Sequence, residues 1–126
     1  MGTKSVAIID DDASANRALG RLLRGAGFEP KGYDSAETFL GDPLRRSFGC
    51  LLVDIQLTGM SGLELQRVLQ AEGSRLPVIF ITAHDDPTAR EEAERRGCLA
   101  FFRKTDPGAL IVDTLRRALV ANGQSQ

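Results

Sequence analysis

The chain has 126 residues, a length that fits one domain whose core needs neither disulfides nor a structural metal. Apolar residues make up 42% of it and aromatic residues only 6%, which predicts a core of mainly aliphatic side chains. With 16 basic and 17 acidic residues, the net charge of −1 argues against a nucleic-acid-binding coat and against a membrane-surface patch.

The first part of the chain alternates apolar runs with a helical pattern. Residues 6–9 form a continuous apolar run, which predicts a buried strand. Apolar residues then recur at helical spacing over residues 19–26, before Gly27 at a favoured helix C-terminal position. Residues 29–33 predict a weak strand, and the proline and glycine within it place that strand at an edge of the sheet.

Two capping boxes predict the starts of the next two helices. Asp34 and Glu37 have the required spacing and predict a short second helix. Residues 50–53 predict a fully buried third strand. Ser61 and Glu64 then have capping-box spacing at the start of a third helix. The apolar residues expected to form the buried stripe of this helix are Leu65, Val68 and Leu69.

The last part of the chain repeats the alternation. Residues 78–81 predict the fourth strand, and the Asp-Pro pair at 86–87 predicts the cap and first position of a helix that ends near residue 96. Residues 99–102 predict the fifth strand, and a second Asp-Pro pair at 106–107 begins the fifth helix. The residues of this last helix expected to face inward are Leu110, Ile111, Leu115, Ala118 and Leu119.

Five predicted strands thus alternate with five predicted helices. Continuous apolar strands are buried on both faces, which indicates a parallel sheet with helices on each side, an α/β doubly wound fold. This pattern does not fix the order of the strands. We expect one domain over residues 1–121 and a polar tail, or the start of a linker, at residues 122–126.

Polar side chains of distinct kinds follow four of the five predicted strands. In proteins with a doubly wound sheet, the residues that bind ligands lie just beyond the carboxyl ends of the strands. The residues in these positions are Asp10, Asp11 and Asp12 after the first strand, Asp54 after the third, Thr82, Ala83 and His84 after the fourth, and Arg103 and Lys104 after the fifth.

The aspartates that follow the first and third strands are expected to converge, because these strands are neighbours in a sheet of this kind. Like charges at close range cannot all stay ionised without compensation. A Mg²⁺ ion would supply that compensation, because it prefers carboxylate oxygens. Asp12 is explained equally well as a helix N-cap, but a cap does not explain Asp54 at the end of a fully apolar strand.

Lys104 and Thr82 add the groups that phosphoryl transfer requires. A carboxylate that accepts a phosphoryl group, as Asp54 would, needs cations to neutralise the developing charge. Lys104 would supply one cation, and the Thr82 hydroxyl would donate a hydrogen bond to a phosphoryl oxygen. Either residue alone has an ordinary structural explanation, but together they indicate a phosphorylatable aspartate.

The strand-end elements also match a known family. They are Ile9-Asp10-Asp11-Asp12, Val53-Asp54, Gly59-Met60-Ser61-Gly62, Ile81-Thr82-Ala83 and Phe101-Phe102-Arg103-Lys104. As a set, they make the chain resemble the receiver domain of two-component response regulators, most closely receivers of the FixJ type. The resemblance covers residues 5–121 and implies a flavodoxin-like, CheY-like (βα)5 fold with a sheet of order 2-1-3-4-5.

The resemblance implies a role for each residue of the site. Asp54 is implied as the phosphoacceptor and as a Mg²⁺ ligand. Asp11 is implied as a direct Mg²⁺ ligand, and Asp10 as a ligand that acts through water. The backbone carbonyl of Gln56 completes the protein ligands, and Lys104 pairs with the phosphoryl group.

A switch is also implied by the resemblance. Thr82 moves to a phosphoryl oxygen, and the ring of Phe101 turns inward behind it, although Phe101 has an alternative explanation as a static core ring. The side chains of Gln56 and His84 flank the phosphoryl group and tune dephosphorylation. Phe102 is expected in the core on the other face of its strand.

Two positions depart from the family pattern. Lys104 is followed by Thr105 instead of the usual proline, so we expect a trans peptide bond or a rearranged loop there. Thr58 stands where the family usually has a proline, which predicts a looser loop before Gly59.

The resemblance implies a histidine kinase or phosphotransfer protein as phosphodonor. It also implies an output domain or protein partner that reads the surface of the fourth helix, fifth strand and fifth helix. The fourth helix has few apolar anchors, chiefly Ala89 and Ala93, so we expect it to shift easily on phosphorylation. A phosphorylation-dependent homodimer is common in the family and is left open, and no direct contact with nucleic acid is expected.

The sequence gives no indication of a zinc site, a secretory signal or a membrane-spanning segment. Cys50 and Cys98 stand inside apolar runs, which predicts two small buried side chains and no zinc site. The N-terminus lacks the pattern of a secretory signal, and no apolar run is long enough to cross a membrane. A cytoplasmic location without membrane contact is expected by default.

The domain is expected to catalyse only its own phosphorylation and dephosphorylation. Three alternatives differ from this expectation. A haloacid-dehalogenase-type phosphatase needs a second aspartate where Gln56 stands. A flavodoxin-like cofactor module needs a phosphate-binding loop in place of the three aspartates at 10–12. A degenerate receiver, which signals without phosphorylation, is kept open by the two missing prolines.

Overall fold

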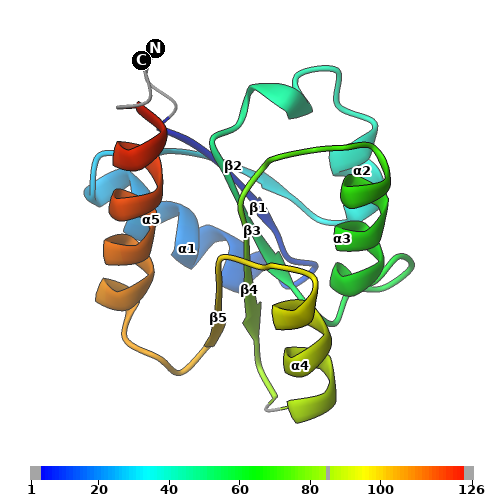
Figure 1. Ribbon diagram of the computed structural model, residues 1–126. Helices are drawn as coiled ribbons and strands as arrows, with labels where there is room; N and C mark the ends of the chain where they lie inside the picture. The colour runs from blue at the N-terminus through cyan, green and yellow to red at the C-terminus, as the bar shows by residue number, and fades with distance from the viewer. Residues whose placement is uncertain (1–3, 85, 124–126) are drawn as a thin grey trace.

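The computed structural model describes residues 4–84 and 86–123 (Figure 1). Its centre is a five-stranded sheet of order β2-β1-β3-β4-β5, in which every pair of neighbouring strands is parallel. The strands are β1 (Ser5–Ile9), β2 (Glu29–Tyr33), β3 (Cys50–Asp54), β4 (Val78–Thr82) and β5 (Ala100–Arg103). The predicted doubly wound fold and the implied strand order are both confirmed.

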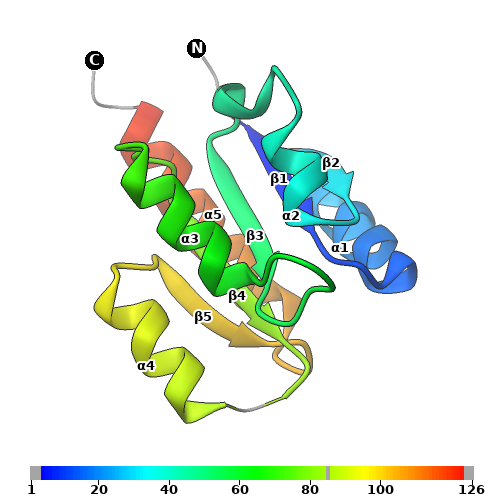
Figure 2. The same ribbon diagram turned by 90° about the vertical axis from the view of Figure 1, so that its right-hand side faces the viewer.

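Helices cover both faces of the sheet. Figures 1 and 2 show α1 and α5 on one face and α2, α3 and α4 on the other. Their bounds are α1 (Ala13–Gly25), α2 (Ala36–Leu40), α3 (Gly62–Ala71), α4 (Pro87–Arg95) and α5 (Gly108–Gly123), with a short 3₁₀ turn at Arg45–Ser47. None of the helices in the described residues is long and apolar enough to span a membrane.

The core has two halves, one on each face of the sheet. Side chains alternate between the two faces along a strand, so neighbouring residues of β1 and β3 enter different halves. All five residues of β3 and all five of β4 are buried. These buried strands hold in place the residues of the site at their carboxyl ends.

Several predicted boundaries are confirmed. Gly27 has a φ of 94°, a left-handed conformation that suits glycine, and follows the C-cap of α1. Ser61 and Glu64 form a complete capping box on α3. The Asp86 side chain accepts a hydrogen bond from the Ala89 amide at 3.1 Å and caps α4.

The predicted start of α2 was wrong. Ser35 caps this helix and accepts a hydrogen bond from the Thr38 amide at 3.0 Å, so Asp34 is not the N-cap. The Glu37 side chain does not accept a hydrogen bond from the backbone at the start of its own helix, as a capping box would require. Its Oε2 atom accepts a hydrogen bond from the Met60 amide at 2.8 Å, because that loop amide lies within reach and has no helical partner.

The inward face of α5 was also predicted with one error. Ile111, Leu115 and Leu119 are buried, but Leu110 is 47% exposed because it lies on the outer side of the helix. The Asp106 carboxylate accepts a hydrogen bond from the Arg103 amide at 2.9 Å, and α5 begins only at Gly108.

The ends of the last two elements differ slightly from the prediction. β5 begins one residue later than expected, at Ala100, and Leu99 is 45% exposed. α5 continues to Gly123, and residues 124–126 of the expected tail lie outside the described residues. Cys50 is buried as predicted, whereas Cys98 is only half-buried.

Candidate functional site

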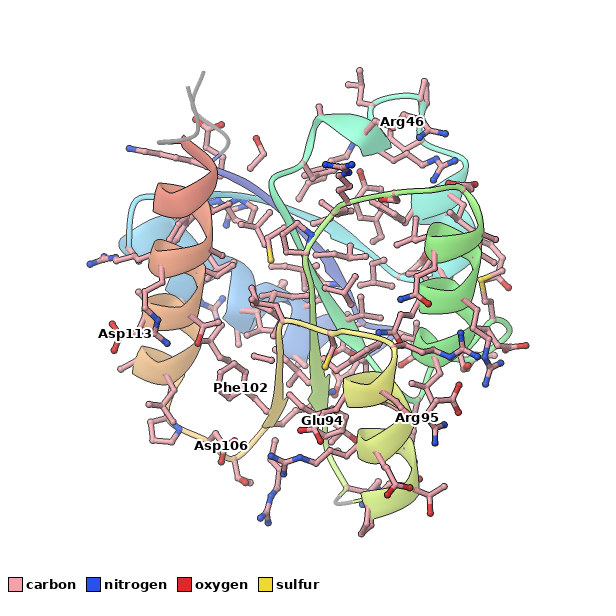
Figure 3. The ribbon with its side chains drawn as sticks, in the orientation of Figure 1. Arg46, Glu94, Arg95, Phe102, Asp106 and Asp113 are labelled. Atoms are coloured by element: carbon pink, nitrogen blue, oxygen red, sulfur yellow. The ribbon has the colours of Figure 1, made fainter. Side chains whose placement is uncertain are left out.

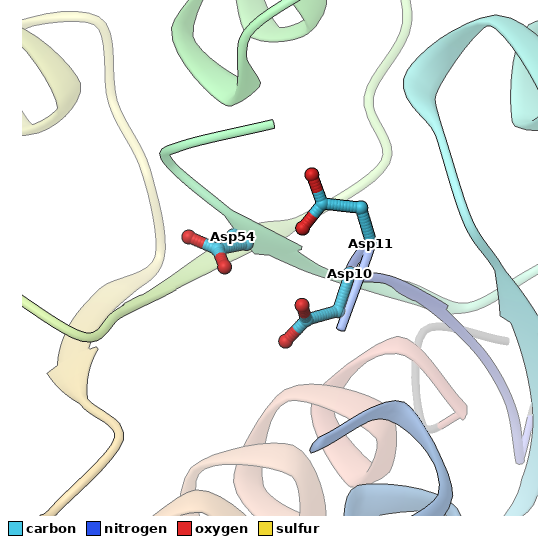
Figure 4. Close-up of side chains that lie close together, drawn as sticks. All are labelled: Asp10, Asp11 and Asp54. Carbon is cyan, nitrogen blue, oxygen red and sulfur yellow. The ribbon is translucent and has the colours of Figure 1, made fainter. Parts of the chain in front are cut away.

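Three carboxylates meet at the carboxyl ends of the two central strands. Asp10 and Asp11 follow β1, and Asp54 ends β3, which pairs with β1. Oxygen atoms of the three side chains all lie within 4.8 Å of one another (Figure 4). Asp10 is 3% exposed and Asp54 is 7% exposed, whereas Asp11 is open to solvent. The predicted convergence is therefore observed.

Lys104 supplies the cation of the site. Its Nζ lies 2.8 Å from Asp10 Oδ2 and 3.0 Å from Asp54 Oδ2, so one ammonium group bridges the two buried carboxylates. The Lys104 amide donates to the Thr82 carbonyl at 2.8 Å, which fixes the backbone beyond the end of β5. The peptide bond to Thr105 is trans, as expected without a proline.

Burial and charge set the ionisation of this group of residues. Burial raises the pKa of Asp54, and the nearby Lys104 and Gln56 amide only partly offset that effect. Burial alone would lower the pKa of Lys104, but hydrogen bonds to Asp10 and Asp54 outweigh it and raise the pKa above its usual value. Lys104 is thus held in its charged form between the two carboxylates.

Backbone amides hold the other oxygen of each buried carboxylate. The Asp12 amide donates to Asp10 Oδ1 at 2.9 Å, and the Gln56 amide donates to Asp54 Oδ1 at 2.9 Å. The Asp12 side chain itself accepts hydrogen bonds from Ser14 and Ala15 and caps α1. Asp12 is therefore a helix cap and not a member of the carboxylate cluster.

Asp11 is held by a residue that the sequence did not indicate. The Thr58 amide and hydroxyl each donate to Asp11 Oδ2 at 3.1 Å. Thr58 thus makes two hydrogen bonds to a neighbouring loop, and the expectation that it loosens its own loop stays a prediction. Proline at this position could make neither bond.

Asn16 is a second contributor that was missed. Its Nδ2 atom donates to the Asp10 carbonyl at 3.1 Å and to the Tyr33 carbonyl at 3.0 Å, which ties the end of β1 to the end of β2. Polar residues are common on the outer face of a surface helix, so no local pattern sets Asn16 apart. Its role depends on the strand pairing.

The expected switch residues lie on β4 and β5, which follow β3 in the order of the sheet. Thr82 is buried, and its hydroxyl donates to the His84 carbonyl at 3.0 Å and accepts from the His84 amide at 3.2 Å. The half-buried ring of Phe101 lies 6.2 Å from the ring of Phe80, and the guanidinium of Arg90 lies 5.5 Å from its centroid. In this structure the Thr82 hydroxyl is thus engaged with the loop that leads to α4.

The remaining candidates lie at the edge of the site. The residues Gln56 and His84 are both exposed. Phe102 packs against the core half that α1 and α5 cover, and Figure 3 shows its ring on the α5 side of β5. The expectation for Phe102 is therefore confirmed.

Comparison with known proteins decides the family. The sequence model of the response regulator receiver domain matches residues 6–116. The chain belongs to the response regulator receiver family. The role of this family is phosphorylation-dependent regulation of an output domain.

Two curated relatives and one solved structure illustrate the match. The response regulator TodT of Pseudomonas putida is 37% identical over 112 residues, which cover 89% of the receiver and 49% of TodT. The transcriptional regulatory protein FixJ of Azorhizobium caulinodans is 37% identical over 116 residues, which cover 90% and 54%. The crystal structure of FixJ-N has a TM-score of 0.84 at 31% identity and covers 95% of the receiver and 96% of that chain. The receiver thus spans about half the length of these curated relatives.

Receivers use Mg²⁺ as a family, and the carboxylate cluster fits such an ion. Its three side chains offer only hard oxygen donors, which Mg²⁺ prefers to nitrogen or sulfur. Two of them, Asp10 and Asp54, are buried, so their charges lack the screening that bulk water gives. A divalent cation would offset this concentration of negative charge.

Proposed function

We propose that Asp54 is the phosphoacceptor of this receiver and that Asp10, Asp11 and Lys104 form the rest of its phosphorylation site. The observation that carries the proposal is the position of Lys104 Nζ, 2.8 Å from Asp10 and 3.0 Å from Asp54. A buried carboxylate at a strand end, paired with one lysine and flanked by further carboxylates, suits phosphoryl transfer better than it suits fold stability.

The phosphodonor is a phosphohistidine of a histidine kinase or phosphotransfer protein. An oxygen of Asp54 attacks the phosphorus, a P–O bond forms and the P–N bond to the imidazole breaks. The imidazole leaves with the bonding electron pair and then takes up a proton. Burial raises the pKa of Asp54, which makes its ionised carboxylate the stronger nucleophile, and Lys104 stays beside it to pair with an oxygen of the transferred group.

The Mg²⁺ ligands are Asp11, Asp54 and the backbone carbonyl of Gln56, with Asp10 acting through water. When bound, Mg²⁺ neutralises negative charge on the phosphoryl oxygens and aligns them for transfer. The donor set supports a site for a hard cation, because Asp10, Asp11 and Asp54 offer carboxylate oxygens that all lie within 4.8 Å of one another. Asp11 is the carboxylate that is open to an entering ion.

Thr82 and Phe101 carry the response to phosphorylation. To reach a phosphoryl oxygen, the Thr82 hydroxyl has to give up its two hydrogen bonds to the His84 backbone, which changes the start of the loop to α4. The Phe101 ring then turns inward from its place under Arg90. The exposed side chains of Gln56 and His84 tune the rate of self-dephosphorylation.

The change is read at the surface of α4, β5 and α5. α4 buries only Ala89 and Ala93, so little apolar area resists its movement. Polar contacts with α3 hold it as well: Arg67 Nε donates to Glu92 Oε2 at 3.0 Å, and Gln70 contacts the Arg96 carbonyl. An output domain or a protein partner binds this surface in a phosphorylation-dependent way, in the cytoplasm.

The test is phosphorylation by a small donor. The protein is incubated with Mg²⁺ and acetyl phosphate, and its intact mass is measured. We expect one phosphoryl adduct on the wild type, no adduct on Asp54→Asn, and the wild-type result for Asp113→Asn, an exposed aspartate on α5. An adduct that persists in Asp54→Asn would refute the assignment. If no adduct forms, a beryllofluoride titration followed by amide NMR separates rapid turnover, which gives large shifts, from a degenerate receiver, which gives none.

A further inference from the structure

The three carboxylates of the site are held in different ways. Asp10 and Asp54 are buried, and each binds Lys104 and a backbone amide. Asp11 is exposed, and its hydrogen-bond donor within the described part of the chain is Thr58. The position of the Asp11 side chain therefore depends on the loop that carries Thr58.

That loop, residues 55–61, is itself held in place. On the side of α2, Glu37 Oε2 accepts a hydrogen bond from the Met60 amide at 2.8 Å. The preceding residue, Gly59, has a φ of 80°, and a Cβ atom there would lie only 2.7 Å from the same Glu37 oxygen. The Glu37 carboxylate thus lies close against the loop, and Thr58 projects from a backbone with a defined position.

Both hydrogen bonds from Thr58 end on one oxygen of Asp11. Oδ2 accepts from the amide and from the hydroxyl, each at 3.1 Å. Oδ1 accepts no hydrogen bond from any residue that the structure describes. Figure 4 shows the Asp11 carboxylate beside those of Asp10 and Asp54, with an oxygen turned toward them. The carboxylate is therefore fixed through one oxygen while the other is free to bind a cation.

We propose that Thr58 is a positioning residue for the Mg²⁺ site: it fixes the Asp11 carboxylate before the ion binds. The proposal rests on the proposed function, because it takes Asp11 to be a Mg²⁺ ligand. An exposed aspartate without this contact would sample several side-chain rotamers, and the ion would have to select one of them. Donors that orient a ligand carboxylate increase metal affinity in the same way in other metal sites.

The test compares three variants by Mg²⁺ affinity and by stability. Thr58→Val keeps the shape and the amide but loses the hydroxyl, and Thr58→Ser keeps both donors. Thr38→Val is the matched control, because the Thr38 hydroxyl donates to Asp34 at 3.2 Å, an aspartate outside the cluster. The Mg²⁺ dissociation constant is measured by amide NMR titration, and the unfolding midpoint is measured in EDTA.

We expect Thr58→Val to bind Mg²⁺ about tenfold more weakly than the wild type, at the lower end of the effect of such orienting partners. Thr58→Ser and Thr38→Val should bind like the wild type. The unfolding midpoint of Thr58→Val in EDTA should match that of Thr38→Val, which separates positioning from a general loss of stability.

Two results would overturn the proposal. If Thr58→Val binds Mg²⁺ as tightly as the wild type or more tightly, the hydroxyl is idle or competes with the ion, and phosphorylation of Asp54 can still be correct. If the wild type itself binds no Mg²⁺ at millimolar concentration, both the metal assignment and the role of Thr58 fail. The acetyl phosphate experiment then shows whether the phosphoacceptor assignment fails with them.

Discussion

Replacement of Lys104 by methionine tests how much the charge of Lys104 contributes to the stability of the folded domain. Methionine has a similar length but no charge, so the variant leaves the Asp10 and Asp54 carboxylates facing each other without their shared cation. Both carboxylates are almost fully buried, at 3% and 7% exposure, so water can replace Lys104 only in part. The metal-free variant should therefore be less stable than the wild type at neutral pH.

The size of the loss follows from the geometry. Two carboxylate oxygens within 4.8 Å repel by about 3 kcal/mol at an effective dielectric constant of about 20. Removal of one partner from a fully buried ion pair costs about 3–5 kcal/mol. The Lys104 side chain is 24% exposed, which admits some screening by solvent, so we expect a loss of about 2–3 kcal/mol in the free energy of unfolding.

The pH dependence gives the sign of the effect. Burial already raises the pKa of Asp54 in the folded wild type, and loss of Lys104 raises it further. The variant should therefore lose the most free energy of unfolding, relative to the wild type, at a pH above the raised pKa of its own Asp54. The difference should shrink as the pH falls toward the ordinary aspartate pKa, where Asp54 is protonated in both proteins. On the alkaline side, the folded-state pKa of Lys104 is raised, so its stabilisation is present below the usual lysine pKa and is lost as the pH rises through the folded-state value.

Chemical denaturation in EDTA at several pH values measures these effects, and Mg²⁺ should restore part of the lost stability at neutral pH. Lys31→Met is the matched control, because Lys31 pairs with Asp42 at 2.8 Å but its side chain is 55% exposed. The control should lose less than about 1 kcal/mol and should not respond to Mg²⁺. Equal losses in the two variants, or a Lys104→Met deficit that does not change between pH 7 and pH 4, would refute the reasoning.

Three further variants or reagents test the surroundings of the site. Ser61→Ala removes one half of the α3 capping box and should lower the free energy of unfolding by about 1 kcal/mol in urea denaturation. Gly62→Ala should lower the free energy of unfolding by about 3 kcal/mol, because the added Cβ would lie 2.4 Å from the backbone oxygen of Asp54, which cannot move aside as a side chain can. A decrease no larger than that of Ser61→Ala would contradict this prediction. In the native protein, a thiol reagent should modify the half-buried Cys98 and spare Cys50, whose thiol is buried and has a pKa raised to about 12; a peptide map after labelling checks this.

The order of elements and the approach of the carboxylates could be predicted because each depends on a local signal. A run such as residues 50–53 is apolar at every position, which in an α/β pattern indicates a strand buried on both faces. An aspartate directly after such a run must lie at the carboxyl end of the sheet. Because β1 and β3 are neighbours, their carboxyl ends lie side by side, which brings together the side chains of Asp10, Asp11 and Asp54.

The contacts that were missed depend on loops that lie far apart in the sequence. Glu37 has the spacing of a capping box, and only the folded loop beside it offers the Met60 amide as a better partner. Thr58 was interpreted through the missing proline, and its bonds to Asp11 become visible only when the two loops are side by side. Leu110 shows the limit of helical periodicity, because a helix that covers one edge of a sheet can leave an apolar residue outside.

The placement of the site between β1 and β3 also affects how the chain folds. Asp11 and Thr58 lie 47 positions apart in the sequence, so their contact forms only after a long loop has closed. Pairing over such distances is slow, since the entropy of loop closure is lost before the contacts form. At neutral pH the repulsion among the three aspartates opposes the same step. We therefore expect the carboxylates of the proposed site to slow folding at neutral pH, and a divalent cation that binds them would lessen this effect.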